Sequence, residues 1–518
     1  LDSLMARRNT QDEAGGRVDG IVAPVKGLNT QTALAGLGQD FAITLDNWIC
    51  QPDSLVSRLG ATSHATGFAS APKTLFMHSS ATGVETFAAC ASGIFDVTGT
   101  GAIGAAVAAC TSGYGKAVNF GISSGQYVYF CNGVDTPKLY NGTTWVSVTG
   151  ASAPAITGPT TTNLIDVETY RQRLYFLHKD YLGFYYLPAD SVGGAAAAFN
   201  IGSLCRLGGK VVAHATWSID AGSGPDDAYV LATSEGEVVV FRGNDPAVPA
   251  NWVYVGTYFI GKPLGQNCFA KFGGDLLYLC ENGLIPASSI TQGVTQNYRQ
   301  ALTLNIQPTI AAAAQAYGAN LGWQVVVYPK LNLILINVPV SSTMSMQYVY
   351  NTMSKAWSTF SNWNAASFVS SNGALYFSTG TLVAQAFNGY ADFDANIVMT
   401  CDTSYNRFRT RSQLQLSLIR ALFASTGPVG YTIGVAQDFS GNYNESSFSA
   451  NGTTAGLWDS GLWDTAIWGG GFELRKDWIT IASRGGLALS TRFKVATKTS
   501  SVVLLALDYK FAEQGLVS

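Results

Sequence analysis

Short runs of β-branched and aromatic residues, each closed by Gly, Asn, Asp or Pro, recur from Phe41 to the end of the chain. This succession of strand-forming runs and turn residues is typical of antiparallel β-sheets. A helical pattern is confined to residues 302–318, where apolar side chains recur at intervals of three and four; they are Ile306, Ile310, Ala313, Ala314 and Tyr317. The pattern predicts an all-β protein with a single helical insertion that starts near Pro308 and ends at Gly318.

Pairs of strand-like runs repeat with a regular spacing. The first strands of five such pairs begin at residues 126, 173, 228, 275 and 374, which are about 50 residues apart except for a last gap of 99. A further unit with strands at residues 323–328, 333–336 and 347–350 fills this gap. A repeat of about 50 residues with four short strands has the size of a β-propeller blade. A stack of β-sandwiches is the alternative, but it explains neither the spacing nor the Trp that recurs after a turn at 145, 252 and 357.

The two ends of the chain differ from the repeats between them. The first twenty residues carry seven charges in a chain that otherwise has few, which predicts an exposed N-terminal arm over residues 1–20. Alternating strands follow Asp402, at residues 413–418, 429–435, 472–481, 487–495 and 502–509, with a tryptophan-rich loop at 457–468. We therefore predict a β-propeller-like domain of four-stranded units over residues 21–400, with the helical insertion near 302–318, and a C-terminal β-sandwich-like domain over residues 401–518.

Composition excludes several classes of protein. Of the 518 residues, 12% are charged, 47% are hydrophobic and 12% are aromatic, which excludes disorder. The net charge of −3 gives no overall attraction to nucleic acid or to anionic lipid. The apolar run at 502–507 is far too short to span a bilayer, and the start of the chain has no apolar core of a signal peptide. The sequence begins with Leu1 and has no initiator Met, so we expect that it starts after trimming.

Cysteine and histidine do not form ligand patterns. The eight cysteines are spread over 350 residues without a CxxC pair, so we expect buried thiols in a reducing cytoplasm instead of disulfides or zinc. The four histidines, His64, His78, His178 and His214, lack the spacing of a metal site. The sequence therefore predicts neither a metal site nor a cofactor site.

Two sequence patterns resemble catalytic or phosphate-binding loops. Residues 121–125 match GxSxG, but a strand follows them where a helix is required, so Ser123 is expected in a hairpin. Residues 256–263 are similar to a phosphate loop, but Pro263 replaces the Ser or Thr that holds magnesium. We expect no catalytic role for either.

Acidic and basic groups offer three further candidates. Residues 392–396 begin like a calcium loop, but Ile397 and Thr403 stand where Gly and Glu are required, so a turn is expected. The carboxylates of Asp226, Asp227, Glu235 and Glu237 are candidates for glycoside hydrolysis, although the two glutamates alternate across a hairpin and are expected to face water. On a strand, Arg407, Arg409 and Arg411 would share one face, either a solvated one or one that meets an anionic partner such as DNA phosphate.

The low share of charged residues points to assembly. A free protein with this composition would be poorly protected against self-association. Obligate interfaces are depleted of charge and rich in aromatic residues, and this chain has 26 Phe, 24 Tyr and 11 Trp. We infer that other subunits cover much of its surface.

Residues 22–34, 42–48 and 51–60 resemble the N-terminal region of the tail hub or nozzle proteins of short-tailed bacteriophages, the tail tubular protein B-like and DNA-stabilisation-like group. The shared features are Gly27-Leu28-Asn29, then Leu45-Asp46-Asn47-Trp48, then Pro52, Arg58 and Gly60. Residues 134–145 are similar to the blade hairpin of this group and residues 458–469 to its tryptophan loop, so the resemblance covers most of residues 20–510. Asn47, Trp48, Pro52, Arg58 and Gly60 are carried over as a structural corner and not as a binding site.

The resemblance implies a virion structural protein of the phage tail, assembled in the cytoplasm of the host bacterium. In this hypothesis a hexameric homo-oligomer forms a ring around the DNA exit channel and links the portal and adaptor to fibre, spike or needle proteins. Genomic DNA passes through the lumen without sequence recognition, and the chain is not an enzyme and inserts into no membrane. The alternatives are a carbohydrate-binding propeller or tail fibre, with Trp252 and Trp357 stacked on sugars, and a propeller hydrolase that uses Glu235 or Glu237.

Overall fold

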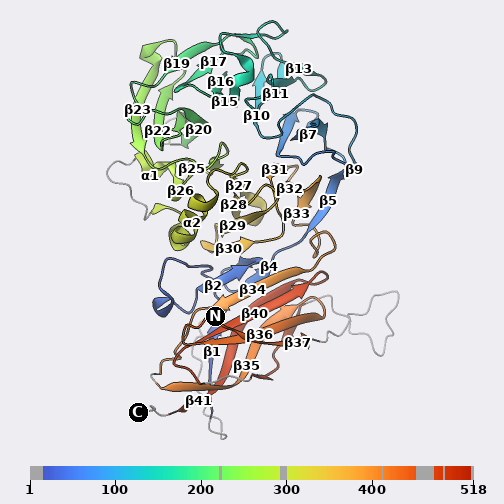
Figure 1. The fold of residues 1–518 in the computed structure, drawn as a ribbon, viewed down its shortest axis with the longest axis vertical. Coiled ribbons are helices and arrows are strands. Elements are labelled where there is room, and N and C mark those ends of the chain that lie inside the picture. The colour runs from blue at the N-terminus through green and yellow to red at the C-terminus, as the bar shows by residue number, and fades with distance from the viewer. Residues whose placement is uncertain are drawn as a thin grey trace. The chain divides into compact units, whose positions relative to one another are not determined.

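The computed structural model describes residues 16–220, 225–291, 300–410, 412–450, 472–481 and 485–514 (Figure 1). The chain forms two compact units: unit 1 comprises Leu1–Thr62, Tyr348–Ser361 and Phe387–Ser518, and unit 2 comprises Ser63–Gln347 and Asn362–Ala386. Almost all regular structure in both units is β-strand. The prediction of an all-β fold is confirmed.

Unit 2 is built around seven blades of antiparallel strands, each of which begins with one inner strand. These inner strands are β6 (Thr74–Ser80), β10 (Lys116–Ile122), β15 (Leu164–Tyr170), β20 (Val211–Asp220), β24 (Phe269–Phe272), β27 (Gln324–Tyr328) and β31 (Ser367–Ser371). Each inner strand contacts the inner strand of the next blade, and the last, β31, contacts the first, β6. The seven blades therefore close into a ring, which is the arrangement of a β-propeller.

The remaining strands of each blade follow outward from the inner strand. The second strands are β7 (Gly83–Cys90), β11 (Gly125–Cys131), β16 (Arg173–His178), β21 (Pro225–Thr233), β25 (Asp275–Cys280), β28 (Leu333–Pro339) and β32 (Ala374–Thr379). The third strands are β8 (Gly93–Asp96), β12 (Lys138–Tyr140), β17 (Gly183–Tyr186), β22 (Glu237–Gly243), β26 (Gly283–Pro286), β29 (Ser345–Asn351) and β33 (Leu382–Ala386); only residues 345–347 of β29 belong to unit 2. Outer strands include β13 (Trp145–Ser147), β19 (Ala197–Asn200) and β23 (Trp252–Phe259).

The ring is closed by a strand from the beginning of the propeller. Strand β5 (Ala61–Thr66) pairs with β33 of the last blade and extends to the short β9 (Gly101–Ala102). A second small pairing joins β14 (Ile156–Thr157) to β18 (Gly194–Ala195). The first and last parts of unit 2 thus share one sheet, so the ring is fastened by main-chain hydrogen bonds.

Local sequence explains the blade hairpins. Asn372-Gly373 links β31 to β32 as a two-residue loop with positive φ at both positions, which is the turn that this dipeptide favours. The predicted helix is confirmed as α2 (Gln307–Tyr317), with Pro308 in its first turn, between the blade of β24–β26 and that of β27. A shorter helix, α1, covers Ala287–Thr291, and 3-10 turns cover Leu34–Gly36, Thr161–Asn163, Pro249–Asn251, Leu304–Ile306 and Pro329–Leu331.

Unit 1 contains two sheets around one apolar core. One sheet has the order β3 (Trp48–Cys50), β4 (Leu55–Ser57), β41 (Val502–Gln514), β35 (Gln413–Ser425), β38 (Glu473–Arg475), with β1 (Arg17–Val22) paired to β41 and β39 (Ile479–Thr480) paired to β35. The other contains β30 (Ala356–Phe360), β2 (Ala42–Asp46), β34 (Ile397–Thr403), β40 (Leu489–Thr497), β36 (Val429–Gln437) and β37 (Asn444–Ala450). Inward side chains of both sheets, such as Leu416, Phe423 and Phe493, form the core of a β-sandwich.

These units change the predicted domain boundaries. Residues 17–20 belong to strand β1, so this part of the expected exposed arm is wrong, and residues 1–15 lie outside the described residues. Residues up to Thr62 join the C-terminal unit because β1 pairs with β41 and β2 pairs with β34. The five predicted C-terminal strands are present as β35, β36, β38 with β39, β40 and β41, whereas the tryptophan-rich loop at 457–468 lies outside the described residues.

Seven of the eight cysteines are buried, as predicted, and Cys205 is half-buried; all eight are free thiols. No described helix is long and apolar enough to cross a membrane.

Candidate functional site: an exposed apolar surface on the propeller

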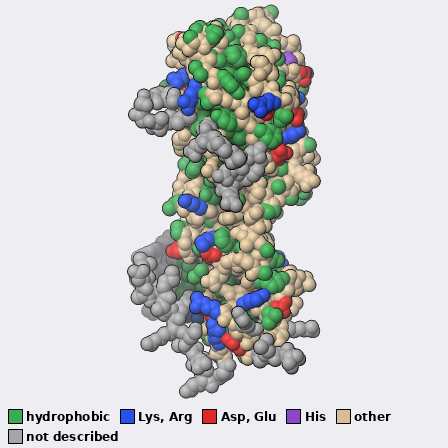
Figure 2. All heavy atoms as spheres, turned by 90° about the vertical axis from the view of Figure 1, so that its left-hand side faces the viewer, with side chains coloured by type: hydrophobic (Ala, Val, Ile, Leu, Met, Phe, Trp, Pro, Cys, Tyr) green, Lys and Arg blue, Asp and Glu red, His purple; other side chains and the backbone are tan. Residues whose placement is uncertain are grey.

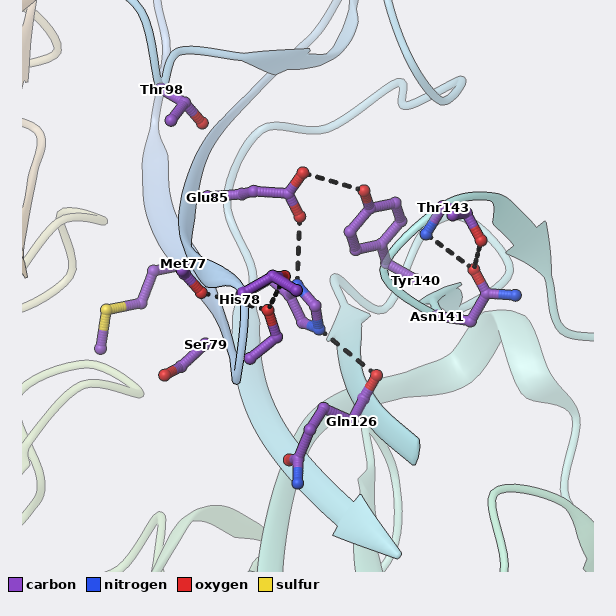
Figure 3. A network of polar contacts seen from close by, with 12 residues as sticks. Met77, His78, Ser79, Glu85, Thr98, Gln126, Tyr140, Asn141 and Thr143 are labelled. Atoms are coloured by element: carbon purple, nitrogen blue, oxygen red, sulfur yellow. Dashed lines mark hydrogen bonds and ion pairs between the residues drawn. The ribbon is translucent and has the colours of Figure 1, made fainter. Parts of the chain in front are cut away.

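The histidines mostly join neighbouring strands of the propeller. Figure 3 shows the contacts of His78 on β6, whose Nδ1 lies 3.1 Å from Glu85 Oε2 and whose Nε2 lies 3.3 Å from the carbonyl oxygen of Gln126. The Tyr140 hydroxyl donates to Glu85 Oε1 at 3.2 Å, and burial together with this carboxylate raises the pKa of Tyr140 to about 12. This network connects the blade of β6–β8 to the blade of β10–β13. Within the described residues, no three His, Cys, Asp or Glu side chains come together as metal ligands.

A second polar cluster lies among the inner strands β10, β15 and β20. Lys116 Nζ lies 3.3 Å from Asp166 Oδ2 and donates to the carbonyl oxygen of His214 at 3.2 Å. His214 Nδ1 lies 2.6 Å from the Tyr229 hydroxyl, and its Nε2 lies 3.5 Å from Asp166 Oδ1. Burial lowers the pKa of Lys116, but Asp166 and Glu168 outweigh this effect and the net shift is upward. The cluster therefore holds a charged lysine that ties three adjacent blades together.

The residues expected to form a structural corner lie in unit 1, where Asn47, Trp48 and Arg58 are buried. The Arg58 side chain uses all five of its N–H donors. Nε donates to Asn47 Oδ1 at 2.7 Å, and the two Nη atoms donate to the two carboxylate oxygens of Asp392 at 2.9 and 2.5 Å. The remaining two N–H groups donate to the carbonyl oxygens of Leu59 and Ser361. Arg58 is 1% exposed and Asp392 is 5% exposed.

The other residues of the expected corner support the same arrangement. Asn47 has a φ of 60°, which Asn tolerates better than most residues, and its amide also donates to the Val398 carbonyl oxygen at 2.7 Å. Trp48 is fully buried in the sandwich core, and a Cβ on Gly60 would overlap the backbone of Ala391. Pro52 is exposed, in the turn between β3 and β4. Four of the five residues are thus required by packing, as expected of a structural corner.

The catalytic look-alikes have structural roles. Ser123 lies in the β10–β11 turn, as predicted, and its backbone N–H and hydroxyl donate to Asp190 at 3.0 and 2.7 Å. Residues 256–259 of the phosphate-loop look-alike belong to strand β23. Residues 392–396 form a turn, as predicted, closed by reciprocal backbone hydrogen bonds between Asp392 and Ala395.

Glu237 and the arginines depart from the predictions, whereas Glu235 lies at the surface as expected. Glu237 does not face water: it is 3% exposed and accepts backbone N–H groups of Arg206 and Leu207. Glu235 pairs with Lys262 at 3.0 Å, and this contact lowers its pKa. Arg407 and Arg409 lie in a turn and not on a strand, so the prediction that they share a strand face is wrong. Arg411 lies outside the described residues. The side chains of residues 219–226, which include Asp226, also lie outside them.

The outer strand β23 carries an unusual exposed surface. Its sequence, Trp-Val-Tyr-Val-Gly-Thr-Tyr-Phe, contains no charged residue. Val253 is 55% exposed, Tyr254 43%, Val255 37% and Phe259 49%, and Leu207 nearby is 54% exposed. We call these five residues the β23 surface. Figure 2 looks onto the side of Figure 1 where β23 lies and shows hydrophobic side chains gathered on the propeller. Exposed apolar side chains that gather on one strand mark a site of interaction more often than scattered ones.

A small pocket lies where several inner strands begin. It has a volume of about 100 Å³ and is lined by Lys73, Tyr114, Asn364 and the hydroxyl-rich turn at 341–345. Lys73 Nζ lies 5.6 Å from the centre of the Tyr114 ring and donates to the Ser342 carbonyl oxygen at 3.3 Å. Burial lowers the pKa of Lys73 and raises that of Tyr114. The pocket offers an aromatic wall beside several hydroxyl and amide groups.

The sugar-stacking tryptophans expected of a carbohydrate-binding propeller lie in the interior. Trp252 is 6% exposed and packs against Phe241 with ring centres 5.3 Å apart, and Trp357 is 1% exposed. Their apolar rings complete the packing of strands, so the prediction that they contact sugars is wrong.

Comparison with known proteins gives no family for this chain. No protein-family model matches it, and no curated protein does. Among solved structures it is similar to BBS1N in complex with ARL6DN, at 9% identity over 64% of this chain and 96% of that one, with a TM-score of 0.38. YCF48 bound to D1 peptide is similar at 9% identity over 67% of this chain and 96% of that one, with a TM-score of 0.32. A glycoside hydrolase family 43 arabinoxylan arabinofuranohydrolase from Bacillus subtilis, in complex with cellotetraose, is similar at 10% identity over 83% of this chain and 88% of that one, with a TM-score of 0.24. None of these three is described as a phage tail protein, and similarities of this size carry no argument on function.

Proposed function

We propose that this chain is a structural subunit of a multi-copy assembly and, following its resemblance to tail hub and nozzle proteins, of a ring in the tail of a short-tailed phage. In this proposal the ring is hexameric, surrounds the DNA exit channel, and joins the portal and adaptor to fibre, spike or needle proteins. The single observation that carries the proposal is the β23 surface, a run of exposed valine and aromatic side chains on an outer strand without charge.

Burial of this surface by another protein is the simplest physical account of it. Outer strands of soluble proteins are normally protected by Lys, by other charges or by Pro, and β23 has none of these residues. Aromatic side chains that leave water are the main source of affinity in protein interfaces. The same inference follows from the whole chain, of which 12% is charged.

The test is the mass of the full chain in solution, measured by light scattering during size-exclusion chromatography at micromolar concentration. We expect a multiple of 54.8 kDa, with six copies as the specific prediction. Val253→Glu places a charge on the β23 surface and should dissociate the assembly. Val134→Glu is the matched control, because Val134 is 58% exposed on a different blade and should leave the mass unchanged. A monomeric wild-type chain would refute the proposal.

A second candidate function is carbohydrate binding, and the pocket beside Tyr114 favours it. Aromatic rings stack on the apolar faces of sugars, while hydroxyl, amide and ammonium groups bind sugar hydroxyls. The pocket combines Tyr114 with Lys73 and Asn364, whereas Trp252 and Trp357 are buried. Glycan-array binding by the full chain that is lost in Tyr114→Ala would support this function. An array without binding, at concentrations where the chain is assembled, would count against it.

A further inference from the structure

Contacts with neighbouring residues fix the position of the Tyr254 side chain on the β23 surface. The Tyr254 hydroxyl donates to Thr257 Oγ1 at 2.9 Å, and the Thr257 hydroxyl donates to the Leu204 carbonyl oxygen at 3.0 Å. The Tyr254 ring also packs against Phe241, with ring centres 6.0 Å apart. The exposed ring is therefore fixed before any partner arrives, so docking onto it costs little side-chain entropy.

The backbone of β23 disfavours docking by simple strand addition. In the pairing with β22, Tyr254 stands opposite Phe241 and Gly256 stands opposite Val240, so Val255 is an extra residue that forms a β-bulge. A bulge interrupts the row of main-chain groups that an added strand would need. A partner should therefore bind this surface through side chains, which is also where the exposed apolar area lies.

The chain itself contains a segment of matching chemistry. Residues 451–471, outside the described residues, connect the end of β37 at Ala450 to β38, which begins at Glu473, both in unit 1. Their sequence carries three apolar pairs at intervals of five residues: Leu457-Trp458, Leu462-Trp463 and Ile467-Trp468. A segment of 21 residues that is joined to the chain at both ends can extend at most about 35 Å from its base.

Charges near the surface complement those in the segment. Arg242 stands opposite Val253 on β22, and the exposed Arg206 directly precedes Leu207. The acidic residues of the segment are Asp459 and Asp464, and each directly follows a tryptophan. The charges of the segment and of the residues around the β23 surface are thus of opposite sign, which favours docking of the one on the other.

We propose that residues 451–471 of one copy dock onto the β23 surface of a neighbouring copy. The inference rests on the proposed function, since it names the partner of the same surface. The segment lies in unit 1 and the surface in unit 2, so the two sides of the contact are different. A contact between unlike surfaces repeats from copy to copy and forms a ring where the rotation between copies closes, whereas a contact between like surfaces ends at a dimer.

The experiment uses the full chain with two classes of variant. The segment variant is Trp458→Ser with Trp463→Ser, and the surface variant is Val253→Glu with Tyr254→Ser. We expect each variant alone to be monomeric by light scattering at a concentration where the wild type is assembled, with an unchanged circular dichroism spectrum. Mixing the two variants should give a heterodimer of one copy of each, because only the intact segment of the surface variant and the intact surface of the segment variant can pair.

Each other outcome overturns a distinct claim. If the wild type is monomeric, the proposed function fails together with this inference. If the wild type assembles and the segment variant assembles equally well while the surface variant does not, a different partner covers β23 and only this inference fails. If both variants are monomeric but their mixture gives no heterodimer, docking between copies is wrong. The double variant Val134→Glu with Tyr390→Ser changes exposed residues elsewhere and should assemble like the wild type.

Discussion

The Arg58 corner buries charged side chains, and the β23 surface exposes apolar side chains. Both arrangements are the opposite of the usual distribution of these residues between the interior and the surface. In the corner, an arginine and an aspartate are 1% and 5% exposed, whereas on β23 valines and aromatic residues are 37% to 55% exposed. The corner is complete within one chain, because every N–H donor of Arg58 has an acceptor from unit 1. The β23 surface has apolar area that the blade does not cover.

This difference separates residues that serve folding from residues that serve assembly. A buried charge is tolerated only where fixed partners surround it, so its neighbours explain it. An exposed apolar surface has no such explanation within the subunit, so it points to a partner outside. If this distinction holds, substitutions in the corner change stability, and substitutions on β23 change the mass of the assembly.

The largest expected effect is that of Arg58→Met. Methionine fills much of the same volume but leaves the Asp392 carboxylate buried without its cation, together with the Ser361 carbonyl oxygen. Breaking a buried pair in this way costs about 3–5 kcal/mol of the unfolding free energy. Urea denaturation followed by tryptophan fluorescence, at a protein concentration where the wild type is also monomeric, should show this loss, whereas Val253→Glu should change the unfolding free energy of the monomer by less than about 0.5 kcal/mol. Equal losses for the two variants would remove the distinction between the regions.

A smaller effect is expected for Gly60→Ala. A Cβ at this position would overlap the backbone of Ala391, which cannot move without shifting the turn that holds Asp392. We expect a loss of about 2–3 kcal/mol in the urea experiment. Gly99→Ala is the control, since a Cβ there meets no atom within 4 Å. A neutral result for Gly60→Ala would mean that the corner adapts, and that its glycine is not required by packing.

Local sequence predicted the blades well because each hairpin is specified by nearby residues. The strands expected at 126, 173, 228, 275, 323 and 374 are β11, β16, β21, β25, β27 and β32. All but β27 are second strands, because the second strand of a blade is covered on both sides and carries the strongest apolar run. The blade of β6–β8 was missed, and so was the closure by β5, which pairs residues more than 300 positions apart. Such pairings depend on the closed ring and leave no mark in a local pattern.

The sequence predicted that part of the surface is covered by other subunits, but not where this part lies. The low share of charged residues indicated a covered surface, but it did not point to β23, because Trp252 to Phe259 has the same composition as many buried strands. The position of the strand at the edge of its sheet distinguishes it, and that position follows from tertiary structure. Similarly, Glu237 was expected at the surface from its hairpin, whereas the loop that carries Arg206 and Leu207 folds over it. Long-range contacts of this kind are not encoded in the spacing of residues.

The corner also contains a carboxylate whose protonation is sensitive to burial. Desolvation raises the pKa of Asp46 above its ordinary value of 3.8, although hydrogen bonds from Ser361 and Thr359 and the charge of Arg58 oppose this effect. The folded protein therefore keeps a proton on Asp46 at a pH where the unfolded chain has lost it. The stabilisation from this proton is complete below pH 3.8 and is lost as the pH rises through the higher pKa of the folded state.

Asp46→Asn tests this smallest effect. In the wild type, the Ser361 hydroxyl donates to Asp46 at 2.7 Å, and the oxygen of an Asn side chain can accept the same hydrogen bond. The amide group of the Asn side chain can donate to Thr359 Oγ1, because the Thr359 hydroxyl can donate its own hydrogen to the Leu45 carbonyl oxygen. Asn does not titrate, whereas the wild type loses the stabilisation from the Asp46 proton as the pH rises. The unfolding free energy of the variant minus that of the wild type should therefore increase from about pH 4 to about pH 7. Asp190→Asn should give the opposite slope below about pH 4, since hydrogen bonds from Ser123 lower the pKa of exposed Asp190 and its stabilising contribution is lost only as the pH falls through that lower pKa. Parallel slopes for the two variants would mean that burial in the corner does not control the charge of Asp46, and that the contrast with the exposed surface is one of packing alone.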